Sequence, residues 1–155
     1  MSAAKRVARD AGTTNYSGVM TSVTDIRPTV DPIPLPRALE GISVDGFYGA
    51  DSTPASLDAC APAVSGVTVS SNDCEPGWIF VAIPGLAQHG VRFAHAAIEA
   101  GACLILTDEV GRREAFERGL GVPVVQVSNP RAVVPLLCRN IYSSPATRLT
   151  TMAVT

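Results

Sequence analysis

The sequence predicts an α/β fold in which a mostly parallel sheet is flanked by helices. Three short apolar runs, at residues 78–83, 103–107 and 122–127, are bounded by turn-forming residues and have the length of buried strands. Segments with helical periodicity, about 10 to 13 residues long, follow these runs. Strands that alternate with helices are joined by right-handed crossovers, which place the strands parallel in one sheet.

The composition is typical of one globular domain. The chain has 155 residues, of which 46% are hydrophobic, and this is enough for one core. Its net charge of -2 gives no general attraction to nucleic acid or to an anionic membrane. No apolar stretch approaches the roughly 20 residues of a membrane-spanning helix, and the basic start lacks the apolar core of a secretory signal. We therefore expect a cytoplasmic protein without nucleic-acid or membrane partners.

The cysteines and the single lysine argue against several kinds of site. Cys60, Cys74, Cys103 and Cys138 are scattered without the short spacings of a zinc site, so we expect reduced thiols and no metal ligands. Lys5 is the only lysine and precedes the expected folded part. A phosphate-binding loop and a receiver domain both need a lysine, so neither is expected there.

The amino-terminal part of the folded region carries weaker signals. Residues 1–30 have no sustained period and are expected to be a disordered tail. A proline cluster follows and should bar a helix before Arg37. Residues 37–40 allow one helical turn, and residues 44–48 allow a short strand.

From residue 65 the pattern is sharper. Residues 66–70 alternate as a strand does, and residues 84–90 form a loop after the next strand. A helix is expected over 91–100, with its apolar face toward the core and Gly101 at its carboxyl end.

The second half of the chain repeats this alternation. Asp108 is the expected N-cap of a helix that ends near residue 118, and Asn129 with Pro130 begins another that runs to residue 142. Pro123 indicates an edge strand or the start of a strand. Pro135 should bend its helix or delay the start of that helix.

A succession of short motifs runs along the chain from residue 67. They are VTVSSN at 67–72, CEPGWIFVAIPG at 74–85, HG at 89–90, AGA at 100–102, TD at 107–108, VSNPRA at 127–132, YSSP at 142–145 and LTTMAVT at 149–155. Their order resembles the start of a Mur ligase of the MurE type. The match is good over residues 65–155 and poor over 28–64, and the succession of pieces is more specific than any one of them.

This resemblance implies a function. MurE-type ligases use ATP and Mg²⁺ to add the third amino acid, diaminopimelate or lysine, to UDP-N-acetylmuramoyl-L-alanyl-D-glutamate in peptidoglycan synthesis. Residues 31–148 would then be the UDP-substrate-binding amino-terminal domain, and residues 149–155 the first strand of a truncated ATP-binding domain. The expected partners are the UDP-muramoyl dipeptide and the remaining ligase domains. Because the ATP loop is absent, we expect no cofactor, no catalytic residue and no ligase activity in this piece alone.

The resemblance also assigns six substrate-binding positions. Ser71 matches the family's substrate-contacting serine, and the segment before the helix at 91–100 matches the loop that wraps the uridine diphosphate, where free amides at the helix start would favour an anion. The triplet Ser70-Ser71-Asn72 replaces an acid-serine-arginine triplet, which removes a bidentate anion contact. The six positions are Val69, Ser71, Leu86, Ala87, Gln88 and His89.

Other interpretations stay open from the residues alone. Ser71 could bond the backbone of its own turn, and His89 could be an exposed loop residue or a helix-start partner. A MurF-type ligase domain is the nearest enzyme alternative, and a non-catalytic nucleotide-sugar-binding or scaffold module is the alternative outside enzymes. A flavodoxin-like domain shares the α/β alternation, but no phosphate loop follows the first clear strand.

Overall fold

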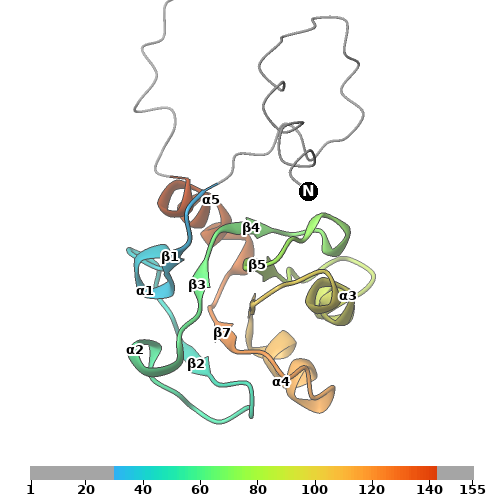
Figure 1. The fold of residues 1–155 in the computed structure, drawn as a ribbon. Coiled ribbons are helices and arrows are strands. Elements are labelled where there is room, and N and C mark those ends of the chain that lie inside the picture. Colours follow the sequence, from blue (N-terminus) through green and yellow to red (C-terminus); the bar gives the residue numbers. More distant parts are fainter. Residues whose placement is uncertain (1–29, 143–155) are drawn as a thin grey trace, which may run out of the picture.

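The computed structural model describes residues 30–142, which form one five-stranded sheet between two layers of helices (Figure 1). Strands β4 to β7 are mutually parallel, and β2 pairs antiparallel with β7. The expected α/β fold with a mostly parallel sheet is therefore confirmed. Across the sheet the order is β2 (Gly46–Tyr48), β7 (Val124–Gln126), β6 (Leu104–Thr107), β5 (Trp78–Val81) and β4 (Gly66–Thr68).

Helices cover both faces of this sheet (Figure 1). One layer contains η4 (Ser71–Asp73), η5 (Gly90–Phe93), α3 (Ala94–Glu99) and α4 (Glu109–Glu117); the opposite layer contains α1 (Leu35–Ala38) and α5 (Pro130–Ile141). A small antiparallel ribbon of β1 (Ile33–Pro34) and β3 (Ala63–Val64) adjoins α1, and α2 (Leu57–Cys60) precedes β3. Among the described residues, no helix is long and apolar enough to span a membrane.

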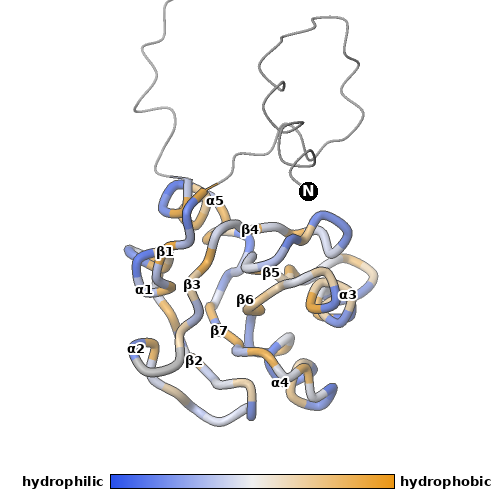
Figure 2. Tube along the Cα trace, viewed as in Figure 1, coloured by the Kyte–Doolittle hydropathy of each residue, from blue (hydrophilic) through white to orange (hydrophobic). Residues whose placement is uncertain are grey.

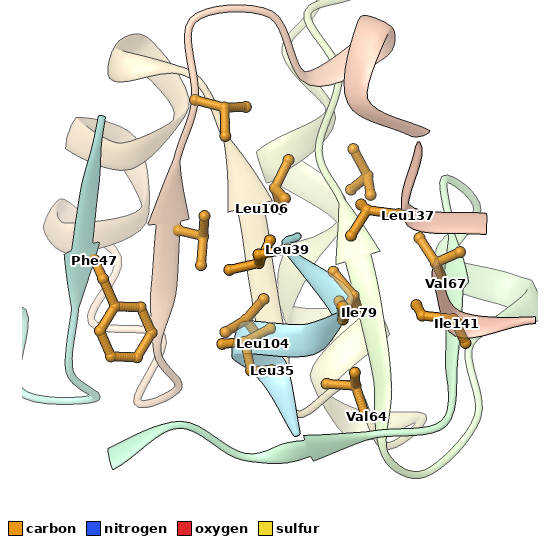
Figure 3. Close-up of a cluster of buried hydrophobic side chains, with 14 residues drawn as sticks. Leu35, Leu39, Phe47, Val64, Val67, Ile79, Leu104, Leu106, Leu137 and Ile141 are labelled. Carbon is orange, nitrogen blue, oxygen red and sulfur yellow. The ribbon is translucent and has the colours of Figure 1, made fainter. Parts of the chain in front are cut away.

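Alternate residues of the central strands fill two separate cores. Ile79 and Leu104 lie in the core on the side of α1 and α5, where Leu104 is beside Leu35 and the same cluster contains Leu137 and Ile141 (Figure 3). Phe80 belongs to the other core, beneath α3 and α4. Burying one such side chain contributes about 1.5–3 kcal/mol, so a strand that is apolar on both faces is held from both sides. The helices carry one apolar face toward these cores. Figure 2 shows this for α4, along which hydrophilic and hydrophobic residues alternate.

The caps expected from the sequence are confirmed. The side chain of Asp108 accepts a hydrogen bond from the amide of Gly111, and Asn129 accepts one from Ala132. Gly101 follows α3 with a φ of +114°, a conformation that favours glycine. The helix expected over 91–100 differs in one respect, because its first turn is the 3-10 segment η5.

The structure decides three expectations about prolines. Helix α1 begins at Leu35, not after Arg37, because Pro36 lies in the first turn, where a helix needs no amide donor. Pro123 immediately precedes β7, so the alternative of a strand start is confirmed; β7 is not an edge strand, because β2 pairs with its other side. Pro135 does not delay α5, which begins at Pro130 as its cap dictates.

Two expected segments lie outside the described residues. They are the tail at 1–30, of which only residue 30 is described, and the strand at 149–155. The boundary proposed at residue 148 falls outside them as well.

Candidate functional site

The carboxyl ends of the parallel strands meet at one edge of the sheet. Val69 and Ser71 follow β4, and the loop of residues 84–89 follows β5. Strands β4 and β5 are hydrogen-bonded neighbours, with Thr68 opposite Phe80, so both segments leave the sheet side by side at this edge. Ligands of open α/β sheets bind outside this kind of edge.

The loop of residues 84–89 is closed by its own backbone. Pro84 and His89 form an antiparallel bridge, and the amide of Gly90 donates to the carbonyl of Ile83 at 2.9 Å. Inside the loop, the amide of Gly85 donates to the carbonyl of Gln88 at 3.2 Å. A Cβ atom at Gly85 would lie 2.6 Å from that carbonyl oxygen, so the close approach requires glycine.

The tip of this loop presents unused amide donors. The backbone amides of Leu86, Ala87 and Gln88 donate to no acceptor within the part of the chain that the structure describes, and all three residues are exposed. The start of the following helix is different. The amides of Gly90 and Arg92 donate to backbone carbonyls, and the amide of Val91 donates to the side chain of His89. The free donors therefore lie in the loop, and the expectation of free amides at the helix start was wrong.

Ser71 has a free hydroxyl within residues 30–142. Its side chain is half-buried in η4 and makes no hydrogen bond to another described residue. The turn is instead closed by Thr68, whose hydroxyl accepts from the amide of Ser70 at 3.0 Å and donates to the carbonyl of Ser70 at 3.2 Å. The alternative of a serine that bonds its own turn is therefore not observed. Val69, next to this turn, is 54% exposed although it is apolar.

His89 is held at both ring nitrogens. Nδ1 accepts from the amide of Val91 at 3.1 Å, and Nε2 lies 3.0 Å from Oδ1 of Asp108. The side chain of His89 is only 10% exposed. It is thus the helix-start partner that the sequence left as an alternative.

Comparison with known proteins identifies the family. A family model described as "Mur ligase family, catalytic domain" matches residues 63–142, which is more than half of the chain. The chain belongs to the Mur ligase family. The matched residues include β4, the loop at 84–89 and α4, so the whole carboxyl edge of the parallel strands lies within the family match.

Curated relatives of this Mur ligase chain carry the name UDP-N-acetylmuramoyl-L-alanyl-D-glutamate--2,6-diaminopimelate ligase. The protein of Streptomyces coelicolor is 35% identical over 92 residues, which cover 59% of this chain and 18% of that protein. The protein of Alkalilimnicola ehrlichii is 36% identical over 106 residues, which cover 63% of this chain and 21% of that protein. The chain thus spans about a fifth of the length of these relatives.

A solved structure is also similar. It is a crystal structure of MurF from Acinetobacter baumannii, with 13% sequence identity and a TM-score of 0.49. The similarity covers 77% of this chain and 23% of that one.

The edge of this Mur ligase domain also contains a group that the sequence did not predict. Ser128, after β7, donates to Oδ2 of Asp45 at 2.7 Å, and a cavity of about 280 Å³ lies beside them. Glu109 and Gln126 line the same cavity. Asp45 and Ser128 are 83 positions apart, and no motif in the sequence connects them.

The whole Mur ligase is expected to use ATP and Mg²⁺, and residues 30–142 do not fit either group. They contain no lysine for a phosphate loop, because Lys5 is the only lysine of the chain. In this range no three His, Cys, Asp or Glu side chains gather as metal ligands would.

Burial raises the pKa of Cys103 to about 11, which keeps its thiol protonated near neutral pH.

Proposed function

We propose that this domain holds the UDP end of UDP-N-acetylmuramoyl-L-alanyl-D-glutamate within a MurE-type ligase. The observation that carries the proposal is the set of backbone amides at 86–88 and the hydroxyl of Ser71, which have no partner among the described residues and which follow two neighbouring strands at the same carboxyl edge. Backbone amides and hydroxyl groups are the donors that a diphosphate and a uracil edge require. The names of the curated relatives support the same substrate.

The side chains around these donors are suited to a nucleotide. Val69 and Leu86 are exposed apolar residues that would offer apolar contact to the face of a base. Arg92, one turn beyond the loop, is exposed and has no carboxylate partner among residues 30–142. A free guanidinium near amide donors would attract a diphosphate and offset the arginine that Asn72 replaces.

The proposal extends to the complete enzyme. The remaining domains would supply ATP, Mg²⁺ and the site for diaminopimelate or lysine, and the reaction would take place in the cytoplasm. The domain described here would bind and orient the nucleotide end of the substrate. The boundaries of this UDP-binding domain are proposed at residues 31 and 148, and residues 149–155 would begin the ATP-binding domain.

Calorimetry with UDP and with the UDP-muramoyl dipeptide tests this function. We expect both ligands to bind, and we expect Ser71→Ala to lower the affinity about 2-fold to 12-fold, since one hydrogen bond contributes about 0.5–1.5 kcal/mol. Ser56→Ala is the matched control, because Ser56 precedes α2 and its side chain makes no capping bond there. An absence of binding at millimolar ligand would reject the proposal in favour of the scaffold alternative.

A further inference from the structure

We propose that His89 is a positioning residue: it fixes the loop of residues 84–89 against the start of α4 and does not itself bind the ligand. This inference rests on the proposed function, since the loop matters only if its amides hold a uridine diphosphate. It changes the role that the family resemblance implied for His89.

The ring nitrogens of His89 have no capacity left for a ligand. Because Nδ1 accepts from the amide of Val91, the neutral ring carries its proton on Nε2. That proton is donated to Oδ1 of Asp108 at 3.0 Å. A neutral imidazole has one donor and one acceptor, and both are used within the protein.

Asp108 connects the imidazole to the next helix. Its Oδ1 atom also accepts the amide of Gly111 at 2.8 Å, as the N-cap of α4. One carboxylate oxygen thus bonds both the end of the loop and the first turn of α4. Asp108 itself follows β6, so the loop is attached to a strand that is paired on both sides.

The packing at Gly111 brings the imidazole against the helix. A Cβ atom at Gly111 would lie 2.6 Å from Cε1 of His89 and 2.0 Å from Oγ1 of Thr107. Thr107 is fully buried and donates to the carbonyl of Ala82 at 3.1 Å, which joins the ends of β6 and β5. The base of the loop is therefore fixed at several points around His89.

A loop fixed in this way loses less freedom when it binds. The tip of the loop is exposed, and apart from the bonds of His89 it is held only by hydrogen bonds within the loop. Without His89 the amides of 86–88 would sample more orientations. Ligand binding would then have to order the loop, and the conformational entropy lost would weaken the affinity. Asp108 should act through His89, and the two residues should behave as one unit.

A double-mutant cycle on UDP affinity tests the inference. We expect His89→Ala and Asp108→Ser to lower the affinity by a similar factor, on the order of fivefold, and the double variant to lose no more than either alone. Serine keeps an N-cap for α4 but is too short to reach the imidazole, so this variant separates capping from positioning. If the two losses multiply, His89 and Asp108 act independently and the proposal is overturned.

Nitrogen-15 spectra of the imidazole give a second readout. We expect a proton on Nε2 and none on Nδ1 in the unmodified chain, and a mixture of tautomers in Asp108→Ser, with faster exchange of the Val91 amide that bonds Nδ1. Unchanged spectra would overturn the positioning role. His95→Ala is the matched control, because His95 is the only other histidine and is exposed on α3. If the unmodified chain does not bind UDP, the proposed function fails, while these spectra still decide whether Asp108 holds His89.

Discussion

At the scale of single residues, Gly111 shows how one missing methyl group permits the arrangement at the sheet edge. Glycine inside a helix is less stable than alanine by about 0.5–1 kcal/mol. Gly111 is nevertheless required in the first turn of α4, because the space of its Cβ is taken by Thr107 and by the ring of His89. The local preference of the helix therefore yields to the packing of the edge.

This packing predicts the effect of Gly111→Ala. The substitution should lower the free energy of unfolding by about 1–3 kcal/mol, the usual range for an overpacked site, although helix propensity alone predicts a gain. Urea denaturation monitored by circular dichroism measures the change. In a Thr107→Ala background the nearest clashing atom is gone, so the added loss should be smaller there; an equal loss in both backgrounds would contradict the explanation.

At the scale of elements, α5 has a favourable N-terminal cap but contains a proline in its interior. Asn129 caps it and Pro130 lies in its first turn, where a fixed φ suits the helix. Pro135 lies within the helix, where it removes an amide donor and its ring crowds the carbonyl of Arg131. The helix persists because Leu137 and Ile141 are fully buried against the sheet.

We expect Pro135→Ala to raise the free energy of unfolding by about 1–3 kcal/mol. The gain is partly offset because alanine has more freedom than proline in the unfolded chain. Pro130→Ala is the control and should give no gain, because Pro130 already suits its position and is buried. Thermal and urea unfolding of both variants measure the difference. A lower free energy of unfolding in Pro135→Ala would show that the ring of Pro135 makes stabilising contacts in the helix.

At the scale of the whole molecule, we expect the centre of the sheet to be its most stable part. β5 and β6 are paired on both sides and covered on both faces, whereas β2 has one paired neighbour in the sheet. The loop of residues 84–89 extends from this rigid centre. A binding loop on a rigid strand can present donors without losing the fold when it moves.

Native-state hydrogen exchange should reveal this gradient. The amides of 79–81 and 104–106 should exchange most slowly, through global unfolding, and those of 46–48 faster. The amides of 86–88 should exchange near the rate of an unstructured peptide and slow down when UDP is added. Slow exchange at 86–88 without ligand would mean that these amides have acceptors, and it would weaken the proposed function.

Much of the fold could be predicted from the sequence because its signals are local. The apolar runs at 78–83 and 103–107 are strands buried on both faces, and Asp108 and Asn129 cap the helices as expected. The error at α1 has a physical cause. A proline excludes certain backbone bonds, but its position in the first turn of a helix means that those bonds are not needed.

The alternation of strands and helices can be read along the chain, because periodicity, caps and turn residues act within a few positions. The candidate site residues came from the order of the motifs and its resemblance to a known family. Which donors are free depends on the tertiary structure. Among the described residues the amides of 86–88 have no acceptor while those of 90–92 do, and His89 is bonded to Asp108, which lies 19 positions away. Hydrogen bonds between distant segments depend on where strands pair in space, and no local pattern encodes that.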